Sequence, residues 1–298
     1  MTRIVAGVDG STSAVNAVVW AAAEAARHRD SVRLVHAYFV PAHGYPRFAA
    51  TASTLREGLR FQGEEMVREA REAVEKVVPE VDVQTELVEG DPAGVLLGES
   101  RQARMVVLGS RGLGGFTGKL LGSVAIALAA HGRCPVVVVR GKRLTDPPPV
   151  EGPVVVGVDG SDTSTAAVTF AFEQASRWGA PLIAVHTWSD LTLDTTVRMY
   201  PLSIDPADVD ADEKRALEEQ LAACRERYPR VAVEPMVARG RPVRTLLEFG
   251  ERARLLVVGS RGRGGFKGML LGSTSHALVV HSPCPVAVVR PPDVDGQR

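Results

Sequence analysis

Two glycine-rich stretches of this chain have the residue types and spacing of an anion-binding loop. In the stretch 109–123 a Gly, two residues, a second Gly, nine residues and then Gly-Ser follow one another, and the stretch 259–273 repeats this spacing. Glycine lets backbone N–H groups approach an anion closely, and a helix that starts after such a loop adds the positive end of its dipole. The spacing therefore predicts that both stretches hold phosphate groups. The residues that carry it are Gly109, Gly112, Gly122 and Ser123 in the first stretch and Gly259, Gly262, Gly272 and Ser273 in the second.

Two familiar phosphate-binding motifs do not account for these stretches. A P-loop needs Gly-Lys followed by Ser or Thr, whereas Lys119 is followed by Leu120, and the second stretch has Met269 in place of the lysine. The dinucleotide fingerprint G-x-G-x-x-G would need a third glycine where Thr117 stands, and it would have to follow the first strand of the fold. The glycine spacing is therefore a pattern of its own.

Both stretches belong to a repeat that spans the chain. One offset of 150 residues relates Gly7 to Gly157 (157 − 7 = 150), and the same offset relates Cys134 to Cys284. An unchanged offset indicates two copies of one domain, of equal length. Between them lie three consecutive prolines, which favour a short, extended connector. We therefore predict two domains, residues 1–146 and 147–298.

Each copy alternates short apolar runs with helix-forming stretches. Continuous apolar strands that alternate with helices indicate a parallel sheet with helices on both faces. The predicted fold class is therefore α/β, with five parallel strands in an open sheet in each domain. In the first copy we expect strands at 3–8, 32–38, 81–88, 105–108 and 135–139, helices at about 11–29, 55–78 and 117–130, and a further helix that begins near Pro92.

The polar residues of each copy fall at the carboxyl ends of the expected strands. Asp9 and its counterpart Asp159 follow the first strand, and the glycine loop follows the fourth. Ligands of open parallel sheets bind at these ends, where the strand order reverses, so we expect the two loops to form one site in each copy. Plainer alternatives are that Asp9 caps the following helix and that the glycines are only turn residues.

Other reactive side chains have plainer interpretations. His36 and His186 lie within apolar strand runs, which favours buried, hydrogen-bonded histidines over ligands. Cys134 and Cys284 precede a proline at the start of an apolar run and are interpreted as core residues. The arginine of each glycine loop fits a phosphate contact and a surface position equally well: Arg111 and Arg261.

The composition excludes several classes of protein. The chain has 298 residues, 45% of them hydrophobic, and 35 Lys and Arg balance 35 Asp and Glu. A net charge of zero argues against nucleic acid and against an anionic membrane surface as partners, and no apolar run reaches the roughly 18–20 residues of a membrane span. The first residues lack the apolar core of a signal peptide, and three cysteines do not form a disulfide framework. We expect a soluble, cytoplasmic protein.

Taken together, these features resemble the universal stress protein family in its tandem-domain form. The resemblance covers both halves, from the Asp-Gly-Ser after the first strand to the Cys-Pro-Val at the fifth. It implies a fold that is flavodoxin-like or adenine nucleotide alpha hydrolase-like. The complete glycine spacing is that of the ATP-binding branch of the family. The resemblance therefore implies ATP, together with Mg²⁺, as the ligand of each half.

The resemblance also implies roles for the matching residues. Asp9 and Asp159 would lie beside the ribose or the phosphate–metal region, and backbone groups around Ala37 and Thr187 would meet adenine. The glycine-loop residues would hold the ribose and the phosphates. The resemblance assigns no catalytic residue. The residues implied to line the two pockets are Gly7, Val8, Gly157 and Val158.

The function predicted from the sequence is that of an ATP-binding protein of stress response or regulation, with two nucleotide sites per chain. The alternative is a slow ATPase or a nucleotidyl-transfer enzyme of a related fold. Against it, the sequence shows no positioned general base, and His36 does not begin the His-x-Gly-His signature of nucleotidyl transferases. For assembly, the resemblance implies pairing of the last strands, residues 134–140 and 284–290, within one chain. We also expect a homodimer of such chains.

Overall fold

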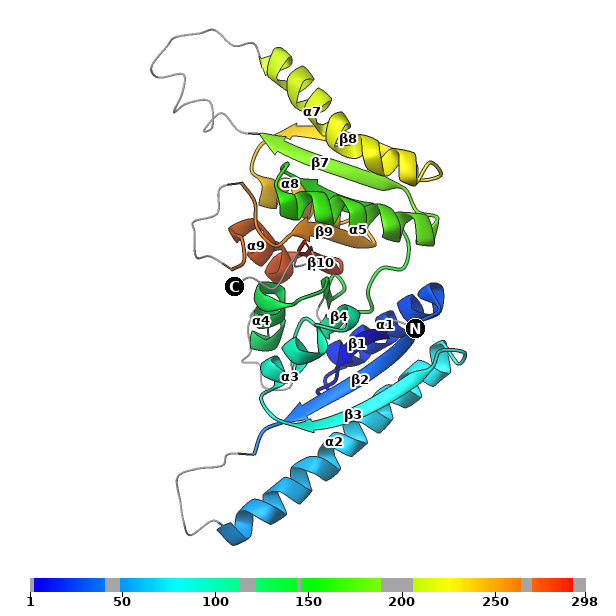
Figure 1. Ribbon diagram of the computed structural model, residues 1–298, viewed down its shortest axis with the longest axis vertical. Coiled ribbons are helices and arrows are strands. Elements are labelled where there is room, and N and C mark those ends of the chain that lie inside the picture. The colour runs from blue at the N-terminus through cyan, green and yellow to red at the C-terminus, as the bar shows by residue number, and fades with distance from the viewer. Residues whose placement is uncertain are drawn as a thin grey trace. The chain divides into compact units, whose positions relative to one another are not determined.

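The chain forms two compact units, Met1–Pro148 and Pro149–Arg298. The computed structural model describes residues 3–40, 49–112, 122–143, 146–188, 206–263 and 270–291 (Figure 1). In both units all paired strands run parallel, with five strands in each described sheet. The α/β fold class predicted from the alternating apolar runs is confirmed.

The first unit winds its chain outward from a central strand in both directions. Its strands lie in the order β3-β2-β1-β4-β5. Because parallel crossovers are right-handed, α1 and α2 cover one face, where they contact each other, and α3 and α4 cover the opposite face. The elements are β1 Arg3–Gly7, α1 Thr12–His28, β2 Ser31–Tyr38, α2 Ala49–Val77, β3 Val83–Glu89, α3 Pro92–Glu99, β4 Ala103–Gly109, α4 Ser123–His131 and β5 Val136–Val139.

The second unit repeats this arrangement. Its strands lie in the order β8-β7-β6-β9-β10, with α5 and α7 in contact on one face and α8 and α9 in contact on the other. The elements are β6 Val154–Val158, α5 Asp162–Trp178, β7 Leu182–Trp188, α7 Pro206–Arg227, β8 Val233–Arg239, α8 Pro242–Gly250, β9 Leu255–Gly259, α9 Ser273–His281 and β10 Val286–Val289.

The central strands form the core of each unit. In the first unit β4 is buried from Met105 to Leu108 and β5 along its whole length, as expected of strands covered on both faces. Helix α1 meets this sheet with alanines and valines, and Ala17, Val18 and Ala21 have no exposed surface. These small side chains let the helix backbone lie close to the strands.

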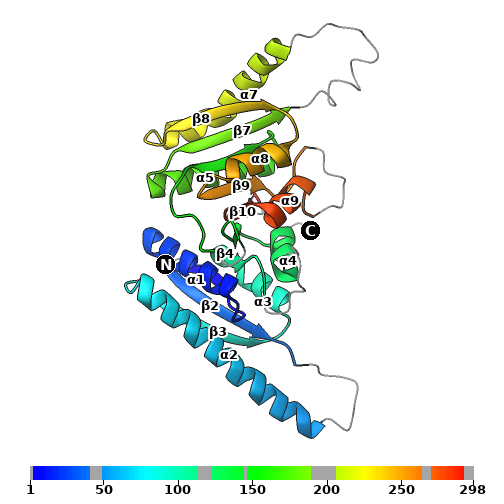
Figure 2. The same ribbon diagram turned by 180° about the vertical axis from the view of Figure 1, so that it is seen from behind.

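Helix α2 differs from the sequence prediction. It begins at Ala49 rather than near residue 55, and both views show it extending past the ends of β2 and β3 (Figures 1 and 2). The side chains from Ser53 to Gln62 are exposed, except for the half-buried Leu59. This part of the helix has no core-facing stripe, so hydrophobic periodicity could not locate its start. Helix α4 begins at Ser123, and residues 117–121 of the expected helix lie outside the described residues.

The strand order reverses between β1 and β4 in the first unit and between β6 and β9 in the second. From β1 the chain proceeds through β2 to β3, and it then returns to place β4 on the other side of β1. The connections after β1 and β4 therefore diverge to opposite faces of the sheet. Ligands of open parallel sheets bind between two such connections, outside the carboxyl ends of the strands. Asp9 and Gly112 lie in these two connections.

The two copies of the first helix end differently, which predicts a difference in stability. Arg29, which follows α1, has φ 55°, whereas its counterpart after α5 is Gly179 with φ 58°. A side chain in this left-handed region costs about 1–2 kcal/mol that glycine avoids. We therefore expect Arg29→Gly to raise the free energy of unfolding by about 0.5–1 kcal/mol, after the added unfolded-state entropy of glycine is deducted.

Urea unfolding monitored by circular dichroism measures this change. The matched control is Gly179→Ala, which imposes the same strain on α5 and should lower stability by about 1 kcal/mol. A destabilised Arg29→Gly variant would contradict the assignment of strain to this residue.

Candidate functional site

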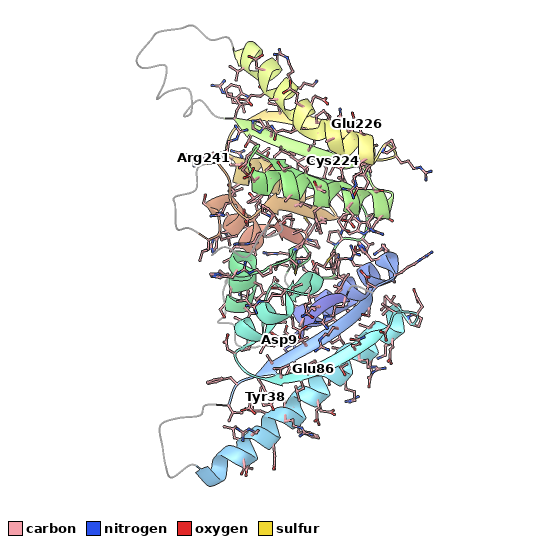
Figure 3. The ribbon with its side chains drawn as sticks, in the orientation of Figure 1. Asp9, Tyr38, Glu86, Cys224, Glu226 and Arg241 are labelled. Carbon is pink, nitrogen blue, oxygen red and sulfur yellow. The ribbon has the colours of Figure 1, made fainter. Side chains whose placement is uncertain are left out.

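The turn after β1 is held by the carboxylate of Asp9. Its Oδ1 accepts hydrogen bonds from the Ser11 backbone N–H at 3.0 Å and from the Ser11 hydroxyl at 2.7 Å. The Ser11 Oγ in turn accepts the N–H of Ala14 at 3.1 Å and so caps α1. Ser11, not Asp9, is therefore the helix cap, and Asp9 positions the cap. Asp9 and Tyr38, labelled in Figure 3, mark the carboxyl ends of β1 and β2.

The second copy reproduces this turn. Asp159 Oδ1 accepts from the N–H of Ser161 at 3.0 Å and from its hydroxyl at 2.7 Å, and Ser161 caps α5 through the N–H of Ser164. The turn glycines also agree, with φ 78° at Gly10 and 74° at Gly160. Side chains disfavour that conformation, so the turn needs glycine in both copies.

The glycine loop after β4 lies directly against this turn. The Ser11 hydroxyl is 3.0 Å from the carbonyl oxygen of Arg111, and the hydroxyls of Ser13 and Ser110 are 3.4 Å apart. A methyl group at Gly112 would collide with Asp9 Oδ2. The two loops that the sequence analysis assigned to one site are therefore in contact. In the second copy Thr163 and Ser161 both donate to the carbonyl of Arg261, and Gly262 faces Asp159 Oδ2 in the same way.

The starts of α4 and α9 lie beside the same loops. We call the turn after the first strand, the glycine loop and this helix start the strand-end cluster of each unit. The N–H of Gly122 donates to the carbonyl of Ser110 at 3.2 Å, and Gly272 donates to Ser260 at 2.8 Å, so each helix starts beside its glycine loop. Both glycines are the N-cap residues of their helices and supply no side-chain cap. The next residue in each copy, Ser123 or Ser273, is exposed.

The expected adenine residues lie on the other side of β1 from the glycine loop. Ala37 and Thr187 are half-buried near the ends of β2 and β7. The preceding histidines turn inward: His36 Nδ1 is 2.8 Å from the carbonyl oxygen of Val8, and His186 Nδ1 is 2.7 Å from that of Val158. The interpretation of both as hydrogen-bonded histidines agrees with this geometry, although His36 is only half-buried.

Two predicted pocket glycines have a packing reason of their own. A methyl group at Gly7 would stand 2.6 Å from Leu108 Cδ2, and one at Gly157 would stand 3.0 Å from Leu246 Cδ1. Glycine at these strand positions therefore lets a neighbouring leucine pack against the backbone. The following residues, Val8 and Val158, are buried at 6% and 4% exposure.

Sequence reasoning missed three side chains at this edge, since their contacts depend on how a helix or a loop packs in three dimensions. Met66 of α2 packs on Gly10, and the Arg263 guanidinium packs on Gly160. Glu213 of α7 lies 3.0 Å from His186 Nε2. Comparison of the two copies could have indicated two of these side chains, because the copies differ at their positions. The 150-residue offset pairs Met66 with Ala216 and Glu213 with Gly63.

The remaining candidate groups show no further chemistry. Cys134 and Cys284 are buried, as interpreted from sequence, and burial raises the pKa of the Cys134 thiol to about 12. Within the described ranges, no three His, Cys, Asp or Glu side chains lie close enough to hold a metal ion. Of the helices that the structure describes, none is both long and apolar enough to cross a membrane.

A family model for the universal stress protein family matches residues 1–140 and 152–290, one match in each unit. The chain belongs to the universal stress protein family. Among curated members, it is 37% identical over 290 residues to universal stress protein Rv2623 of Mycobacterium tuberculosis, with 96% of both chains covered. It is 38% identical over 292 residues to universal stress protein Rv2005c of the same organism, again with 96% of both covered.

The fold of this universal stress protein also has a solved counterpart. A universal stress protein from Archaeoglobus fulgidus superposes with a TM-score of 0.69 at 21% sequence identity, covering 97% of this chain and 98% of that one. At this identity the likeness concerns the fold, and it extends over both units. The tandem form of the family predicted from the sequence repeat is confirmed.

The surroundings of the loop glycines predict two different responses to substitution. A methyl group at Gly109 would stand 2.7 Å from the Ser13 carbonyl carbon and 2.8 Å from the Ala14 nitrogen, so α1 would have to move. At Gly122 the nearest atom would be 4.0 Å away. We expect Gly109→Ala to lower the free energy of unfolding by about 2 kcal/mol or more, and Gly122→Ala by less than about 1 kcal/mol.

Both variants are compared in urea unfolding of nucleotide-stripped protein, because a ligand bound only to the folded state would add its own stabilisation. The second copy supplies a replicate, since Gly259 faces the Thr163 backbone at 2.8 Å. Equal losses of unfolding free energy in Gly109→Ala and Gly122→Ala would show that the packing around Gly109 is not the reason for its glycine.

Proposed function

We propose that each unit binds one molecule of ATP at the carboxyl edge of its sheet, and that the protein acts in stress response or regulation through these two nucleotides. Membership of the universal stress protein family supports the biological setting. The nucleotide itself is supported by the site: a glycine loop, an acidic turn and a helix start converge in each unit where the strand order reverses.

The observation that carries this proposal is the start of α4 and of α9. The first N–H groups of a helix have no acceptor within the helix, and Gly122 and Gly272 offer no side-chain cap. The backbone of Gly122, with φ −62° and ψ 136°, is one that any residue adopts, and a methyl group there would lie 4.0 Å from the nearest atom of the described residues, the Gly112 nitrogen. Within the described part of the chain the packing therefore does not require glycine here, and a residue without a side chain leaves the helix start accessible to a phosphate group.

The other end of the nucleotide would meet the ends of β1 and β2. Val8 and Ala37 have small apolar side chains, and the Val8 carbonyl is engaged by His36. The base would therefore pack on apolar surface while the phosphates meet backbone amides. Val158 and Thr187 offer the equivalent surface in the second unit, with a hydroxyl added by the threonine.

The residues present fit a Mg²⁺ ion bound together with the phosphates. Asp9 Oδ1 is engaged by Ser11, and Asp9 Oδ2 accepts no hydrogen bond within the described part of the chain. One carboxylate oxygen suits Mg²⁺, which binds proteins through one or two carboxylates and takes its other ligands from phosphates and water. When bound, the ion would neutralise phosphate charge. Asp9 and Asp159 are the residues that would hold it; the Oδ2 of Asp159 accepts the N–H of Arg263 at 3.3 Å and has a second lone pair for the ion.

We infer binding rather than catalysis as the role of the site. The acidic group nearest the glycine loop is Asp9, whose Oδ1 holds the turn and the helix cap, so its use as a general base would disturb both. A multiple-turnover assay distinguishes the alternatives. Steady phosphate release would favour the slow ATPase, and stoichiometric retention of ATP would favour a binding protein. The homodimer and the cytoplasmic location stay predictions.

The double variant Gly112→Ala with Gly262→Ala tests the two proposed sites. Each added methyl group would collide with the Oδ2 of Asp9 or Asp159, so the carboxylate would have to shift within its turn, whereas the strands and the core side chains are not touched. The displaced carboxylate and methyl group would then occupy the space proposed for phosphate. We expect the double variant to lose most bound ATP and each single variant to lose about half.

The measurement is nucleotide released from purified protein, quantified per chain by ion-exchange chromatography. Gly58→Ala is the matched control, because a methyl group there meets no atom within 4 Å. Circular dichroism verifies folding. Undiminished ATP in a folded double variant would refute the site. An equal loss of ATP from the Gly58→Ala control would refute the explanation that the methyl groups act by displacing the aspartate carboxylates.

A further inference from the structure

The two copies place chemically different side chains over the same turn. In the first unit the Met66 side chain covers Gly10, with Cγ, Sδ and Cε 3.0–3.1 Å from the position of an added Cβ. In the second unit the guanidinium of Arg263 covers Gly160, with its Cζ 3.0 Å and its Nε 3.3 Å from that position. The sequence offset pairs Arg263 with Leu113 and Met66 with Ala216. An apolar side chain therefore covers one turn and a cation covers the other.

The backbone of Arg263 is anchored in the site. Its backbone N–H donates to Asp159 Oδ2 at 3.3 Å, and it directly follows Gly262 in the glycine loop. The residue is exposed, and among the residues that the structure describes its guanidinium forms no ion pair. The acidic side chain that α7 adds to this edge, Glu213, is engaged by His186. A positive charge thus lies beside the acidic turn and the glycine loop, and no acidic side chain of the described residues forms an ion pair with it.

A guanidinium in this position favours ligands that carry more phosphate. Its planar N–H groups can bind two phosphate oxygens at once, and such charge-assisted hydrogen bonds are stronger than neutral ones. At the corresponding turn of the first unit, the Met66 side chain offers only van der Waals contact. A nucleoside monophosphate, with one phosphate group, would gain less from Arg263 than a triphosphate with three.

We propose that the two sites differ in the nucleotide they select: the second unit prefers nucleoside triphosphates to monophosphates, with Arg263 as the specificity-determining residue, and the first unit discriminates less. This inference rests on the proposed function, because it concerns the same two sites.

The selectivity of each site is measured by isothermal titration of nucleotide-stripped protein with ATP and with AMP. Gly112→Ala leaves the second site to be titrated, and Gly262→Ala leaves the first. We expect the ratio of the AMP Kd to the ATP Kd to be about tenfold larger at the second site, which corresponds to about 1.4 kcal/mol. Adding Arg263→Leu to Gly112→Ala should reduce this ratio to that of the first site. Arg263→Lys should retain part of it.

Arg177→Leu, added to Gly112→Ala, is the matched control for charge. Arg177 lies in the last turn of α5, at the opposite edge of the sheet, so its loss removes one positive charge without touching the loop. The control should keep the full ratio. Equal ratios at the two sites, or an unchanged ratio in Arg263→Leu, would overturn the inference while leaving the proposed function intact. If neither ATP nor AMP binds the wild-type chain, the proposed function fails and the inference fails with it.

Discussion

The hydrogen bonds between Asp9 and Ser11, and their copies at Asp159 and Ser161, are the interactions on which the strand-end cluster depends. The Ser11 hydroxyl lies 2.7 Å from Asp9 Oδ1 and 3.0 Å from the Arg111 carbonyl oxygen, so one proton is shared between two acceptors. Its oxygen also accepts the helix N–H of Ala14. One serine thereby joins the end of β1, the start of α1 and the glycine loop after β4. An ionised carboxylate suits this role because it acts only as an acceptor.

Away from this cluster, the two copies form the same sheet with side chains of different polarity. On the first sheet Arg33 forms ion pairs with Glu86 and Glu99 at 3.4 and 3.3 Å. The sequence offset places apolar residues at all three positions of the second copy: Ile183, Met236 and Phe249. The strands pair in the same order in both units. The same strand order thus forms with half-buried ion pairs in one unit and with apolar residues at the same positions in the other, as expected where desolvation offsets attraction. The acidic turn is kept in both copies.

The fold could be predicted from the sequence because its signals are local. Buried parallel strands are short apolar runs, Pro92 marks a helix start, and the repeat shows every element twice. The contact between the two strand-end loops also followed, since the carboxyl ends of β1 and β4 are neighbours in this topology. The start of α2 did not, because its exposed first turns carry no hydrophobic period. Nor did the contacts of Met66, Arg263 and Glu213, which depend on how a helix or loop packs in three dimensions.

The presence of both strand-end clusters on one polypeptide gives the two proposed sites an independence that identical subunits lack. In an assembly of identical chains, every substitution appears in all sites at once, so an arginine gained by one is gained by all. Here position 263 carries arginine while position 113 keeps leucine, and position 66 carries methionine while position 216 keeps alanine. Covalent linkage also keeps the two sites in equal number at any dilution. Mutation can therefore alter the chemistry of one half of this molecule while that of the other half stays unchanged.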